Sequence, residues 1–277
     1  MKIGYFITAR LKSSRLKQKV ILPLNNLNVI EHVIRRCQLV SGIEGVVMCT
    51  STNSQDALLY DYALKHQIKF FPGSEHDVLA RLLDAAKYYG FDAFLSITAD
   101  NPLHSPHIAN IIVDWVRREP SDFVFTSGVP IGLAPYFITT KALEVAVEMK
   151  KESDTEIWGP FVNRPDFFNI GYLDIKTALF APNIRLTCDY LEDYFLLEDI
   201  YRHFIPGYCP SLFEIARLIQ EEKVVLQNLQ VEQRTVDDLV LEKINDNFEA
   251  NKRRGEEIAK NIGLILRPGK RKLEITL

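Results

Sequence analysis

The sequence predicts an α/β fold, a mostly parallel sheet with helices on both faces, followed by a helical C-terminal extension. Three observations indicate this fold. Short apolar runs alternate with amphipathic stretches up to about residue 206, which is the rhythm of a parallel sheet covered by helices. A basic loop directly follows the first apolar run, and beyond about residue 207 polar, helix-forming stretches replace the alternation.

The alternating segments give the order of the elements. Apolar runs predict strands at residues 2–8, 45–50, 69–71, 93–98 and 122–126. Apolar residues at helical spacing predict helices at residues 29–40, 54–66, 77–89 and 106–118. Further on, we predict a helix at residues 140–151, strands at 167–173 and 184–187, and a helix at 192–204. Residues 128–135 are rich in turn formers, so we expect them to cover an open face of the domain.

The C-terminal part of the chain has a different character. Residues 210–222 and 236–261 are polar with periodic apolar positions, and residues 267–272 are basic and turn-rich. We therefore divide the chain into a domain at residues 1–206 and a helical extension at residues 207–277. The extension is expected to pack on the domain or on a second subunit, and a helix that contributes only stability is an equally good interpretation.

Composition limits the class of protein. A chain of 277 residues, 47% of them hydrophobic, supports one large α/β domain with an appendage. The net charge of −3 argues against nucleic acid as the main ligand. The sequence has no run of 18 apolar residues and no separate apolar signal segment, so we expect a cytoplasmic protein with no membrane partner. Its four cysteines and six histidines lack metal-ligand spacing, which favours reduced thiols over a zinc site.

The basic loop has the sequence TARLKSSRLKQK at residues 8–19 and follows the first predicted strand. In an open α/β sheet, ligands bind outside the carboxyl ends of the strands, and a loop that feeds a helix there offers N–H groups and a favourable dipole to an anion. Arg10, Arg15 and Lys19 add the charge needed to hold a triphosphate. A solvated basic loop is the alternative, because short motifs have many false matches.

Five segments of the chain form a larger pattern. They are the basic loop, VMCTSTN at residues 47–53, GSEHDVLAR at 73–81, ITADNPL at 97–103 and RLTCDYLED at 185–193. In this order and spacing they resemble the sugar cytidylyltransferases, the family of the 3-deoxy-manno-octulosonate and acylneuraminate enzymes, and most closely its spore-coat polysaccharide branch. The resemblance covers roughly residues 1–205 and implies a Rossmann-like fold of the nucleotide-diphospho-sugar transferase type.

The resemblance implies nucleotidyl transfer, in which a hydroxyl attacks the α-phosphorus of CTP and pyrophosphate leaves. Such catalysis consists largely of neutralising phosphate charge and aligning the reactants, so Mg²⁺ is the expected cofactor. Asp100 and Asp189 match the two family carboxylates that hold the metal. A strand-end Asp by itself fits a helix cap or a turn equally well, and the two acids converge only if both strand ends open on one crevice.

The resemblance also implies the roles of the other site residues. Arg15, Lys19 and Asp100 are expected to be catalytic, with Lys19 placed to meet the β- and γ-phosphates. The nucleotide is expected to contact Ala9, Arg10, Ser13, Thr50, Ser51, Asn53, Arg81 and Thr98. Arg81 fits a cation on a helix surface equally well.

The chain departs from the family in the phosphate loop. The family's loop glycine is Lys12 here, and its Pro-Gly before the final lysine is Lys17-Gln18. Loss of glycine limits positive φ angles and close approach of the backbone. The extra lysines partly offset this loss by raising the local positive charge.

The acceptor side diverges most from the spore-coat-like branch. A loop that reads P-R-G-x-D-x-E in that branch is PIGLAPY at residues 130–136, and an E-H pair becomes Glu156-Ile157 beside Trp158. We expect Gly132, Tyr136, Glu156 and Trp158 to contact the acceptor. Because this surface replaces charge with apolar and aromatic groups, the acceptor is predicted to differ from the branch's common one.

The sequence therefore predicts a Mg²⁺-dependent cytidylyltransferase that transfers CMP from CTP to a sugar or sugar acid for a surface polysaccharide. A transferase that uses another triphosphate or a sugar 1-phosphate is one alternative, and a binding subunit that has lost catalysis is another. Retention of Asp100, Asp189, Arg15 and Lys19 favours the enzyme. The resemblance also implies a homodimer.

Overall fold

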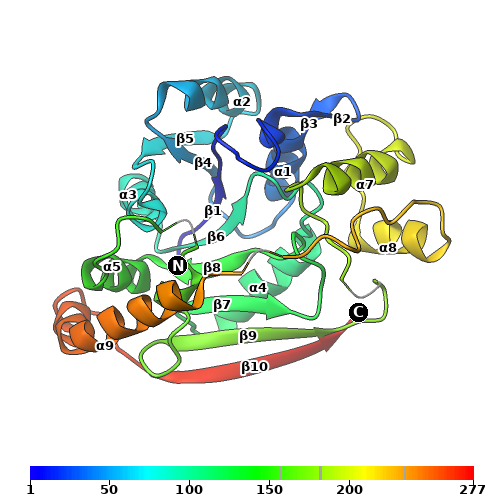
Figure 1. Cartoon of the computed structure of the whole chain (residues 1–277). Helices are drawn as coiled ribbons and strands as arrows, with labels where there is room; N and C mark the ends of the chain where they lie inside the picture. The colour runs from blue at the N-terminus through cyan, green and yellow to red at the C-terminus, as the bar shows by residue number, and fades with distance from the viewer. Residues whose placement is uncertain (156, 181–182, 234) are drawn as a thin grey trace.

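The computed structural model describes residues 1–155, 157–180, 183–233 and 235–277. These residues form an eight-stranded sheet in the order β10-β9-β7-β8-β6-β1-β4-β5, with helices on both faces (Figure 1). β8 runs antiparallel to β6 and β7, and the other neighbouring strands of this sheet run parallel. The predicted fold class, a mostly parallel α/β sheet with a helical C-terminal region, is confirmed.

The elements follow the predicted order closely. The strands of the large sheet are β1 (Ile3–Thr8), β4 (Val46–Ser51), β5 (Lys69–Gly73), β6 (Ala93–Thr98), β7 (Phe123–Ser127), β8 (Tyr136–Thr139), β9 (Asn169–Lys176) and β10 (Gly269–Thr276). A small hairpin pairs β2 (Pro23–Leu24) with β3 (Leu27–Asn28). The helices are α1 (Val29–Gln38), α2 (Leu59–Lys65), α3 (Val78–Tyr89), α4 (Pro106–Arg118), α5 (Thr140–Met149), α6 (Gly159–Val162), α7 (Leu191–Arg202), α8 (Leu212–Gln220) and α9 (Asp238–Asn261), with 3-10 turns at Lys19–Ile21 and Ser54–Leu58.

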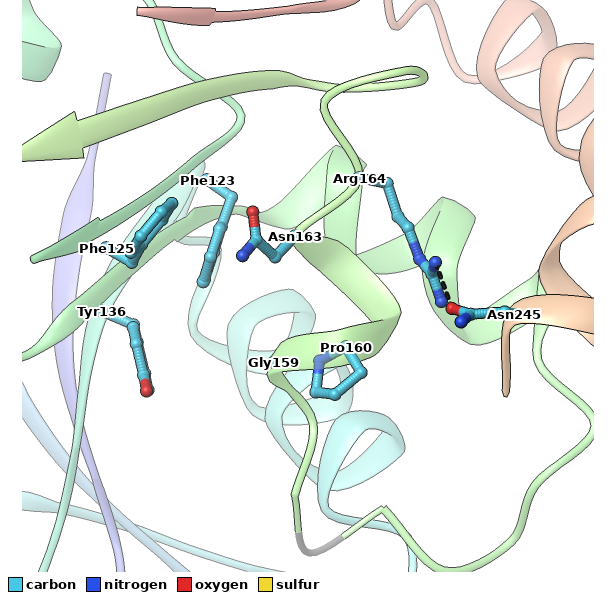
Figure 2. A pocket seen from close by; sticks show the side chains of 8 residues that line it. All are labelled: Phe123, Phe125, Tyr136, Gly159, Pro160, Asn163, Arg164 and Asn245. Carbon is cyan, nitrogen blue, oxygen red and sulfur yellow. Dashed lines mark hydrogen bonds between the residues drawn. The ribbon is translucent and has the colours of Figure 1, made fainter. Parts of the chain in front are cut away.

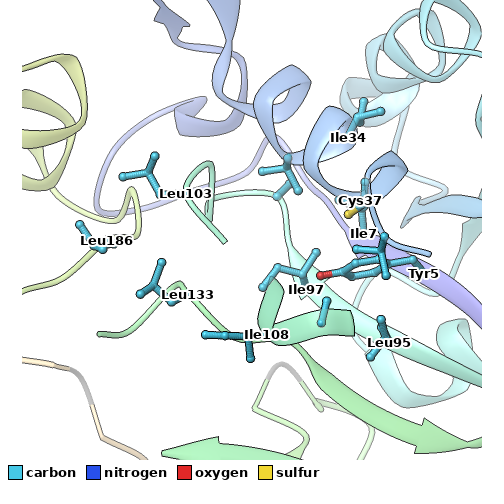
Figure 3. Packing of buried hydrophobic residues seen from close by; sticks show 14 of the residues in the cluster. Tyr5, Ile7, Ile34, Cys37, Leu95, Ile97, Leu103, Ile108, Leu133 and Leu186 are labelled. Atoms are coloured by element: carbon cyan, nitrogen blue, oxygen red, sulfur yellow. The ribbon is translucent and has the colours of Figure 1, made fainter. Parts of the chain in front are cut away.

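Alternate residues of the strands supply two cores, one on each face of the sheet. On β1, Tyr5 and Ile7 join the core that contains residues of α1, α4 and α7, whereas Phe6 joins the core with α3, α5 and α9. Phe6 stacks on Phe94 of β6 with ring centroids 4.2 Å apart. Figure 3 shows the first of these cores, in which Leu133 packs with the strand residues. Burial on both faces explains why these strands read as continuous apolar runs.

Two helices near the site begin with side-chain caps. Asp77 accepts a hydrogen bond from Ala80 N at 3.0 Å before α3, and Ser105 accepts one from Ile108 N at 3.2 Å before α4. Each cap satisfies a backbone N–H that the helix leaves without an internal partner. The caps fix where the loops after β5 and β6 end.

Residues 184–187 do not form the predicted strand, and residues 128–135 do not cover an open face. Arg185 makes an isolated bridge with Ile131, and Leu186 N donates to Ile131 O at 2.9 Å. Leu133 is fully buried, and its carbonyl accepts from Ser105 N at 2.7 Å. Both segments pack into the domain as irregular backbone because each satisfies hydrogen-bonding groups of its neighbours.

The C-terminal extension is not purely helical. Residues 267–272 are predicted as turn-rich, but from Gly269 onward they belong to β10, which pairs in parallel with β9 along its length. Leu273 and Ile275 pack against the core while Lys272 and Glu274 are exposed, so the alternation of a strand is present among charges that suit a sheet edge. The division of the chain at residue 206 stays a prediction. β10, from the C-terminal part of the chain, belongs to the same sheet as β1.

Helix α9 lies along α5 (Figure 1). A Cβ atom on Gly255 of α9 would lie 2.2 Å from Met149 Sδ at the end of α5, so glycine is needed for this close approach. Ile244 and Phe248 of α9 are buried in the same contact region. The close packing holds α9 in the core that also contains Phe123 of β7 and Ile138 of β8.

Candidate active site

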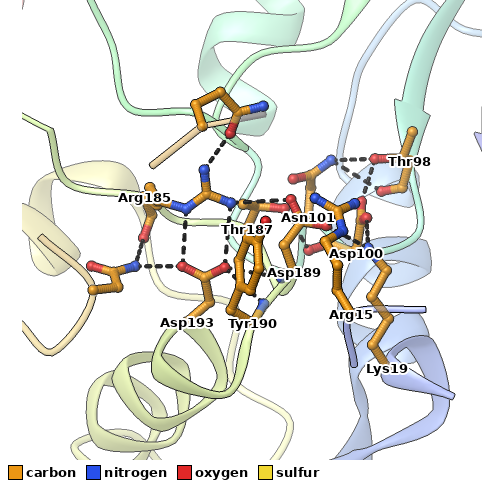
Figure 4. Close-up of polar contacts among 12 residues, drawn as sticks. Arg15, Lys19, Thr98, Asp100, Asn101, Arg185, Thr187, Asp189, Tyr190 and Asp193 are labelled. Atoms are coloured by element: carbon orange, nitrogen blue, oxygen red, sulfur yellow. Dashed lines mark hydrogen bonds and ion pairs between the residues drawn. The ribbon is translucent and has the colours of Figure 1, made fainter. Parts of the chain in front are cut away.

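Asp100 and Asp189 meet at the amine of Lys19 (Figure 4). Lys19 Nζ lies 2.6 Å from Asp189 Oδ1 and also pairs with Asp100. Asp100 follows β6 and Asp189 precedes α7, and the two loops are joined because Cys188 N donates to Asp100 O at 2.8 Å. The structure therefore brings the two acids together near the carboxyl ends of β1 and β6.

Two arginines and one tyrosine surround Asp189. Arg15 Nη2 lies 2.7 Å from Asp189 Oδ1, and Arg185 Nη2 lies 3.1 Å from Asp189 Oδ2. The Tyr190 ring lies 5.4 Å from the Arg15 guanidinium carbon and 5.7 Å from that of Arg185. Arg15 keeps 32% of its side chain exposed and Arg185 only 2%. Arg15 is thus the more available of the two for a ligand.

A buried carboxylate behind Asp189 holds the loop in place. Asp193 is fully buried, and its Oδ2 accepts from the backbone N–H groups of Asp189 at 3.0 Å and Tyr190 at 3.1 Å. Asn228 Nδ2 donates to Asp193 Oδ1 and to Arg185 O, both at 2.8 Å. Our sequence reasoning assigned no role to Arg185, Asp193 or Asn228. Arg185 and Asp193 stand in the RLTCDYLED segment, which was the available signal.

The electrostatics of the cluster keep its members charged. Burial alone lowers the pKa of Lys19, but the charges and hydrogen bonds of Asp100 and Asp189 outweigh burial and raise this pKa. Burial alone raises the pKa of Asp100, but the charge and hydrogen bond of Lys19, with a hydrogen bond from Thr98, outweigh it and lower the pKa. Lys19 is therefore an ammonium and Asp100 a carboxylate at neutral pH.

The acid pair fits a hard divalent cation. One oxygen from Asp100 and one from Asp189 converge on the single atom Lys19 Nζ. Oxygen ligands from one or two carboxylates, completed by phosphates and water, suit Mg²⁺. Within the described ranges, no group of three or more His, Cys, Asp or Glu side chains gathers to hold a metal, so the protein's share of such a site is these two acids.

The phosphate loop takes a different route from the one predicted. It leads into the 3-10 turn at Lys19–Ile21 and the β2–β3 hairpin, and α1 begins only at Val29. The loop therefore does not lead directly into an α-helix, and the prediction that it feeds a helix whose dipole favours an anion is wrong. Gln18, which stands where the family has glycine, has φ 52° and ψ 27°. The left-handed conformation is thus kept without glycine.

The predicted nucleotide contacts Ala9, Arg10, Ser13 and Thr98 differ in burial. Ala9 is buried, and its N–H donates to Cys49 O at 3.0 Å. Arg10 and Ser13 are partly exposed. Thr98 is exposed at the end of β6, donates its hydroxyl to Asp100 and accepts from Asn101 Nδ2 at 2.6 Å. Thr98 therefore sets the orientation of the Asp100 carboxylate.

The two predicted residues at the end of β4 are both buried, but only the Ser51 hydroxyl is paired within the fold. Ser51 donates to Asp56 Oδ2 at 2.5 Å, and Asp56 Oδ1 accepts from Leu11 N at 2.7 Å. Asp56, which our sequence reasoning missed, thereby ties the phosphate loop to β4. Thr50 is fully buried, and its hydroxyl has no hydrogen-bond partner among the residues that the structure describes.

A bridge on Glu75 joins the phosphate loop to the end of β4. Lys12 Nζ donates to Glu75 Oε1 and Asn53 Nδ2 donates to Glu75 Oε2, both at 3.3 Å. Arg81 of α3 is 1% exposed and donates to Ser74 O at 2.9 Å. The alternative of a surface cation at Arg81 is therefore wrong, and a contact with the nucleobase stays a prediction.

The predicted acceptor residues fall into different environments. Tyr136 is 45% exposed at the start of β8, and Trp158 is buried behind it with ring centroids 5.4 Å apart. Gly132 has φ +97°, and a Cβ there would lie 2.5 Å from Leu186 O, so this position needs glycine for backbone packing. Glu156 lies outside the described residues. Tyr136 is thus the residue of this set that the fold presents at a surface.

The sheet, the cationic loop at the end of β1 and the acids opposite it are the features of the nucleotidyltransferase class of α/β enzymes. The family described as Cytidylyltransferase matches residues 5–231, and the chain belongs to this family. The predicted resemblance to the sugar cytidylyltransferases is thereby confirmed, and the chain is an enzyme of the nucleotidyltransferase type. None of the described helices is long and apolar enough to span a membrane.

Similar proteins extend over most of the chain. An uncharacterised protein of Methanocaldococcus jannaschii is 32% identical over 206 residues, 74% of this chain and 85% of that protein. A spore coat polysaccharide biosynthesis protein of Bacillus subtilis is 25% identical over 209 residues, 72% of this chain and 86% of that protein. The 8-amino-3,8-dideoxy-manno-octulosonate cytidylyltransferase of Shewanella amazonensis is 26% identical over 175 residues, 59% of this chain and 65% of that protein.

The structure of a cytidylyltransferase from Leptospira borgpetersenii has the same fold. The TM-score is 0.76 at 24% identity, and the match covers 86% of this chain and 100% of that chain. The Rossmann-like architecture predicted for residues 1–206 therefore has an experimentally solved counterpart.

Proposed function

We propose that this enzyme transfers CMP from CTP to a hydroxyl of a sugar or sugar acid and releases pyrophosphate, in the synthesis of a surface polysaccharide. Cytidine as the nucleoside comes from the family, and the acceptor class comes from the relatives in spore coat polysaccharide and octulosonate metabolism. The observation that carries the proposal is the convergence of Asp100 and Asp189 on Lys19, beside Arg15. This arrangement provides both carboxylate oxygens for a cation and, in Lys19 and Arg15, cations that can pair with a triphosphate.

In this proposal the two carboxylates have two alternative partners, the amine of Lys19 and a divalent cation. Lys19 Nζ occupies the position on which both carboxylates converge, so a divalent cation held by the same oxygens excludes the amine from it. Mg²⁺ bound there would neutralise charge on the triphosphate as pyrophosphate leaves. Lys19 then exchanges carboxylate partners for phosphate oxygens, and it remains charged throughout.

The remaining residues of the site hold the carboxylates and phosphates that take part in this exchange. Arg15, a third exposed, releases Asp189 and pairs with phosphate oxygens through its planar guanidinium. Thr98 holds one oxygen of Asp100, and Arg185 with Asp193 holds the Asp189 loop. Because these residues hold the two carboxylates rigidly, they help to align an acceptor hydroxyl with the α-phosphorus. A homodimer stays a prediction.

Pyrophosphate release tests the proposal. Purified protein is incubated with Mg²⁺, a panel of sugar acids and sugars, and CTP, UTP, GTP or ATP in separate reactions. We expect release with CTP and at least one acceptor, and loss of release in Asp100→Ala. Glu257→Gln is the matched control, because Glu257 is a 67% exposed acid on α9. A protein that binds no CTP by calorimetry, with or without Mg²⁺, contradicts the proposal.

A further inference from the structure

The loop between β5 and α3 is joined to the phosphate loop, but none of the side chains at residues 74–76 is buried. Ser74 and His76 are exposed, and Glu75 is partly exposed. Glu75 nevertheless accepts hydrogen bonds from Lys12 of the phosphate loop and from Asn53. Segments with few buried apolar contacts open easily. The position of this loop therefore depends on hydrogen bonds to neighbouring segments.

A mostly buried lysine binds the end of this loop. Lys150 follows α5, its side chain is 8% exposed, and its amine pairs with Asp77 Oδ2 directly before α3. The same amine donates to Glu152 O at 2.9 Å. Asp77 in turn donates its N–H to Ser74 Oγ at 3.0 Å. Lys150 thus holds the residue at which the loop ends.

Thr155 makes a second link between the segment after α5 and the same loop. Its hydroxyl donates to Asp77 Oδ1 at 3.1 Å and accepts from Leu79 N at 3.0 Å. Its backbone N–H donates to His76 O at 3.2 Å. Residues 150–155 therefore hold both the Asp77 carboxylate and the backbone of the loop.

The pair of Lys150 with Asp77 is not needed to begin α3. Asp77 already caps this helix through Oδ1, which accepts from Ala80 N at 3.0 Å. Desolvation offsets much of the attraction in a mostly buried ion pair, so such a pair is often no more stabilising than apolar residues in its place. What the lysine adds is a fixed geometry, because its amine joins the carboxylate of Asp77 to the carbonyl of Glu152.

Helix α9 supports residues 150–155 from the other side. Asn247 Nδ2 donates to Glu152 Oε1, and Glu152 is the residue whose carbonyl Lys150 binds. The next residue of α9, Phe248, is buried in the core that contains residues of α5. The family match ends at residue 231, so this support comes from outside the matched region.

A second asparagine of α9 binds a different segment. Asn245 Oδ1 accepts from Arg164 Nη1 at 2.6 Å, and both residues line a cavity of about 360 Å³ (Figure 2). The cavity is also lined by the aromatic rings of Phe123, Phe125 and Tyr136. Asn245 and Asn247 are therefore a matched pair, in which Asn247 reaches residues 150–155 and Asn245 reaches the cavity wall.

We infer, on the basis of the proposed function, that Lys150 is a positioning residue for the nucleotide. It fixes residues 74–76, and through Glu75 it sets the place of the two side chains that Glu75 binds. One of these belongs to the phosphate loop, and the other is Asn53, a predicted nucleotide contact. Loss of Lys150 should therefore weaken the binding of CTP while the acid pair stays intact.

Calorimetry of CTP binding in Mg²⁺ tests this role without an acceptor. We expect Lys150→Met to raise the Kd for CTP about 3- to 20-fold, the range for residues that act on a site through their neighbours. A loss of folded protein lowers the stoichiometry of binding, whereas a misplaced loop raises the Kd. Lys150→Arg is expected to keep part of the affinity because it keeps the charge.

The matched asparagines and a neighbouring lysine supply the controls. Asn247→Ala should raise the Kd for CTP about twofold, because it leaves the ion pair of Lys150 in place. Asn245→Ala should leave this Kd unchanged. Lys151→Met should also leave it unchanged, because Lys151 is exposed. All variants are compared by thermal melting, and Lys150→Gln, which keeps a donor, replaces Lys150→Met if the latter does not fold.

A double variant tests whether Lys150 acts through the bridge on Glu75. Glu75→Gln is expected to raise the Kd for CTP by itself, because it weakens the contacts with Lys12 and Asn53. If Lys150 acts through Glu75, Lys150→Met adds little to Glu75→Gln. If the two effects multiply, Lys150 does not act through Glu75 and this inference is wrong.

The remaining outcomes separate this inference from the proposed function. If the wild type binds CTP but Lys150→Met changes only the stoichiometry or the melting temperature, Lys150 is structural, the inference is wrong and the proposed function stands. The same holds if Asn245→Ala and Lys151→Met raise the Kd as much as Lys150→Met does. If the wild type binds no CTP, both the proposed function and this inference fail.

Discussion

At the carboxyl ends of β1 and β6, charged side chains contact one another directly, whereas around Tyr136 the walls of a cavity leave space for a ligand. The nucleotide side pairs Lys19, Asp100 and Asp189, and it anchors Asp189 through the buried Asp193. The cavity around Tyr136 is lined by aromatic rings and by Arg164, whose Nε and Nη2 are buried without a hydrogen-bond partner among the described residues. In the proposed reaction, the side chains at the acid pair therefore exchange existing partners when the nucleotide binds. The groups around the cavity instead gain partners that they lack when a ligand binds there.

The largest expected effect comes from removing the amine that separates the two acids. Lys19→Met removes the amine that pairs with both acids, so Asp100 loses its lysine partner while Asp189 keeps Arg15 and Arg185. Breaking a mostly buried ion pair in this way lowers the free energy of unfolding by about 3–5 kcal/mol. Because the amine no longer competes for the carboxylates, Mg²⁺ is expected to restore part of this stability, while pyrophosphate release is lost. Urea unfolding with and without Mg²⁺ measures both effects.

Lys17→Met is the control for this prediction, because Lys17 is an exposed lysine of the same loop. We expect it to change stability by less than about 0.5 kcal/mol. A Lys19→Met protein that is as stable as the wild type, or that gains nothing from Mg²⁺, would show that the acids and the amine are not coupled.

The protein should also lose stability in mild acid, because His32 of α1 is fully buried beside Leu24 and Tyr201. Burial lowers the pKa of His32 to about 4, with Arg36 and Arg35 adding to the decrease. The unfolded chain binds a proton at His32 below about pH 6.5 and the folded chain does not, so stability is complete above pH 6.5 and is lost as the pH falls toward 4. The shift corresponds to about 3 kcal/mol.

Unfolding by urea between pH 7.5 and 4.5 measures this loss, with His32→Gln as the variant. The slope of stability against pH should be smaller in the variant than in the wild type, and His107→Gln, at an exposed position of α4, is the comparison. His104 is expected to add to the wild-type slope, because burial and Arg36 lower its pKa to about 3. An equal slope in His32→Gln and in the wild type would contradict the prediction.

On the acceptor side, the corresponding change should affect binding rather than folding. Tyr136→Ala removes a 45% exposed ring from the cavity, so we expect a loss of stability below about 1 kcal/mol. The KM for the acceptor should rise about tenfold, a loss of about 1.4 kcal/mol in binding, with the KM for CTP unchanged. Steady-state kinetics with each substrate varied in turn gives both values.

Trp158→Ala sharpens the same comparison. Trp158 is buried behind Tyr136, and its removal should lower the free energy of unfolding by about 3–5 kcal/mol. If Tyr136→Ala instead changed the KM for CTP as much as that for the acceptor, the two sides of the site would not be separate.

The smallest expected effect is a gain. Gln18 has φ 52°, a conformation that disfavours residues with a Cβ by about 1–2 kcal/mol and that glycine adopts freely. After the greater flexibility of glycine in the unfolded chain is counted, Gln18→Gly should raise the free energy of unfolding by about 0.5–1 kcal/mol. Chemical denaturation measures it, and Lys17→Gly, at a neighbouring exposed position, should not stabilise the protein.

Local patterns in the sequence predicted the parts of the fold that depend on local physics. The strands around β1 are buried on both faces, so their apolar runs were visible, and the caps at Asp77 and Ser105 lie where the predicted helices begin. β8 has four residues directly after a turn-rich segment, and β10 lies on a sheet edge with charged residues on its exposed side. In neither strand is the pattern of apolar residues strong enough to predict a strand against the turn-forming or charged residues around it.

The site residues likewise divide into those that stand in recognisable sequence segments and those that do not. Asp100, Asp189, Arg15 and Lys19 stand in segments whose order resembles a family, so their convergence could be predicted. Arg164 and Asn245 stand in no such segment, and they meet because α9 folds back along α5. Contacts of this kind depend on long-range packing, for which a single sequence carries no periodic signal.

The joint action of Asp100 and Asp189 on one metal ion is the central claim, and calorimetry of CTP binding tests it most directly. The wild type, Asp100→Asn, Asp189→Asn and the double variant are each titrated with CTP in Mg²⁺ and in EDTA. We predict that Mg²⁺ tightens binding at least about tenfold in the wild type, that each single variant loses this effect, and that the double variant loses no more than either single one. CTP binding with equal affinity in Mg²⁺ and EDTA, or losses that add in the double variant, would contradict the claim.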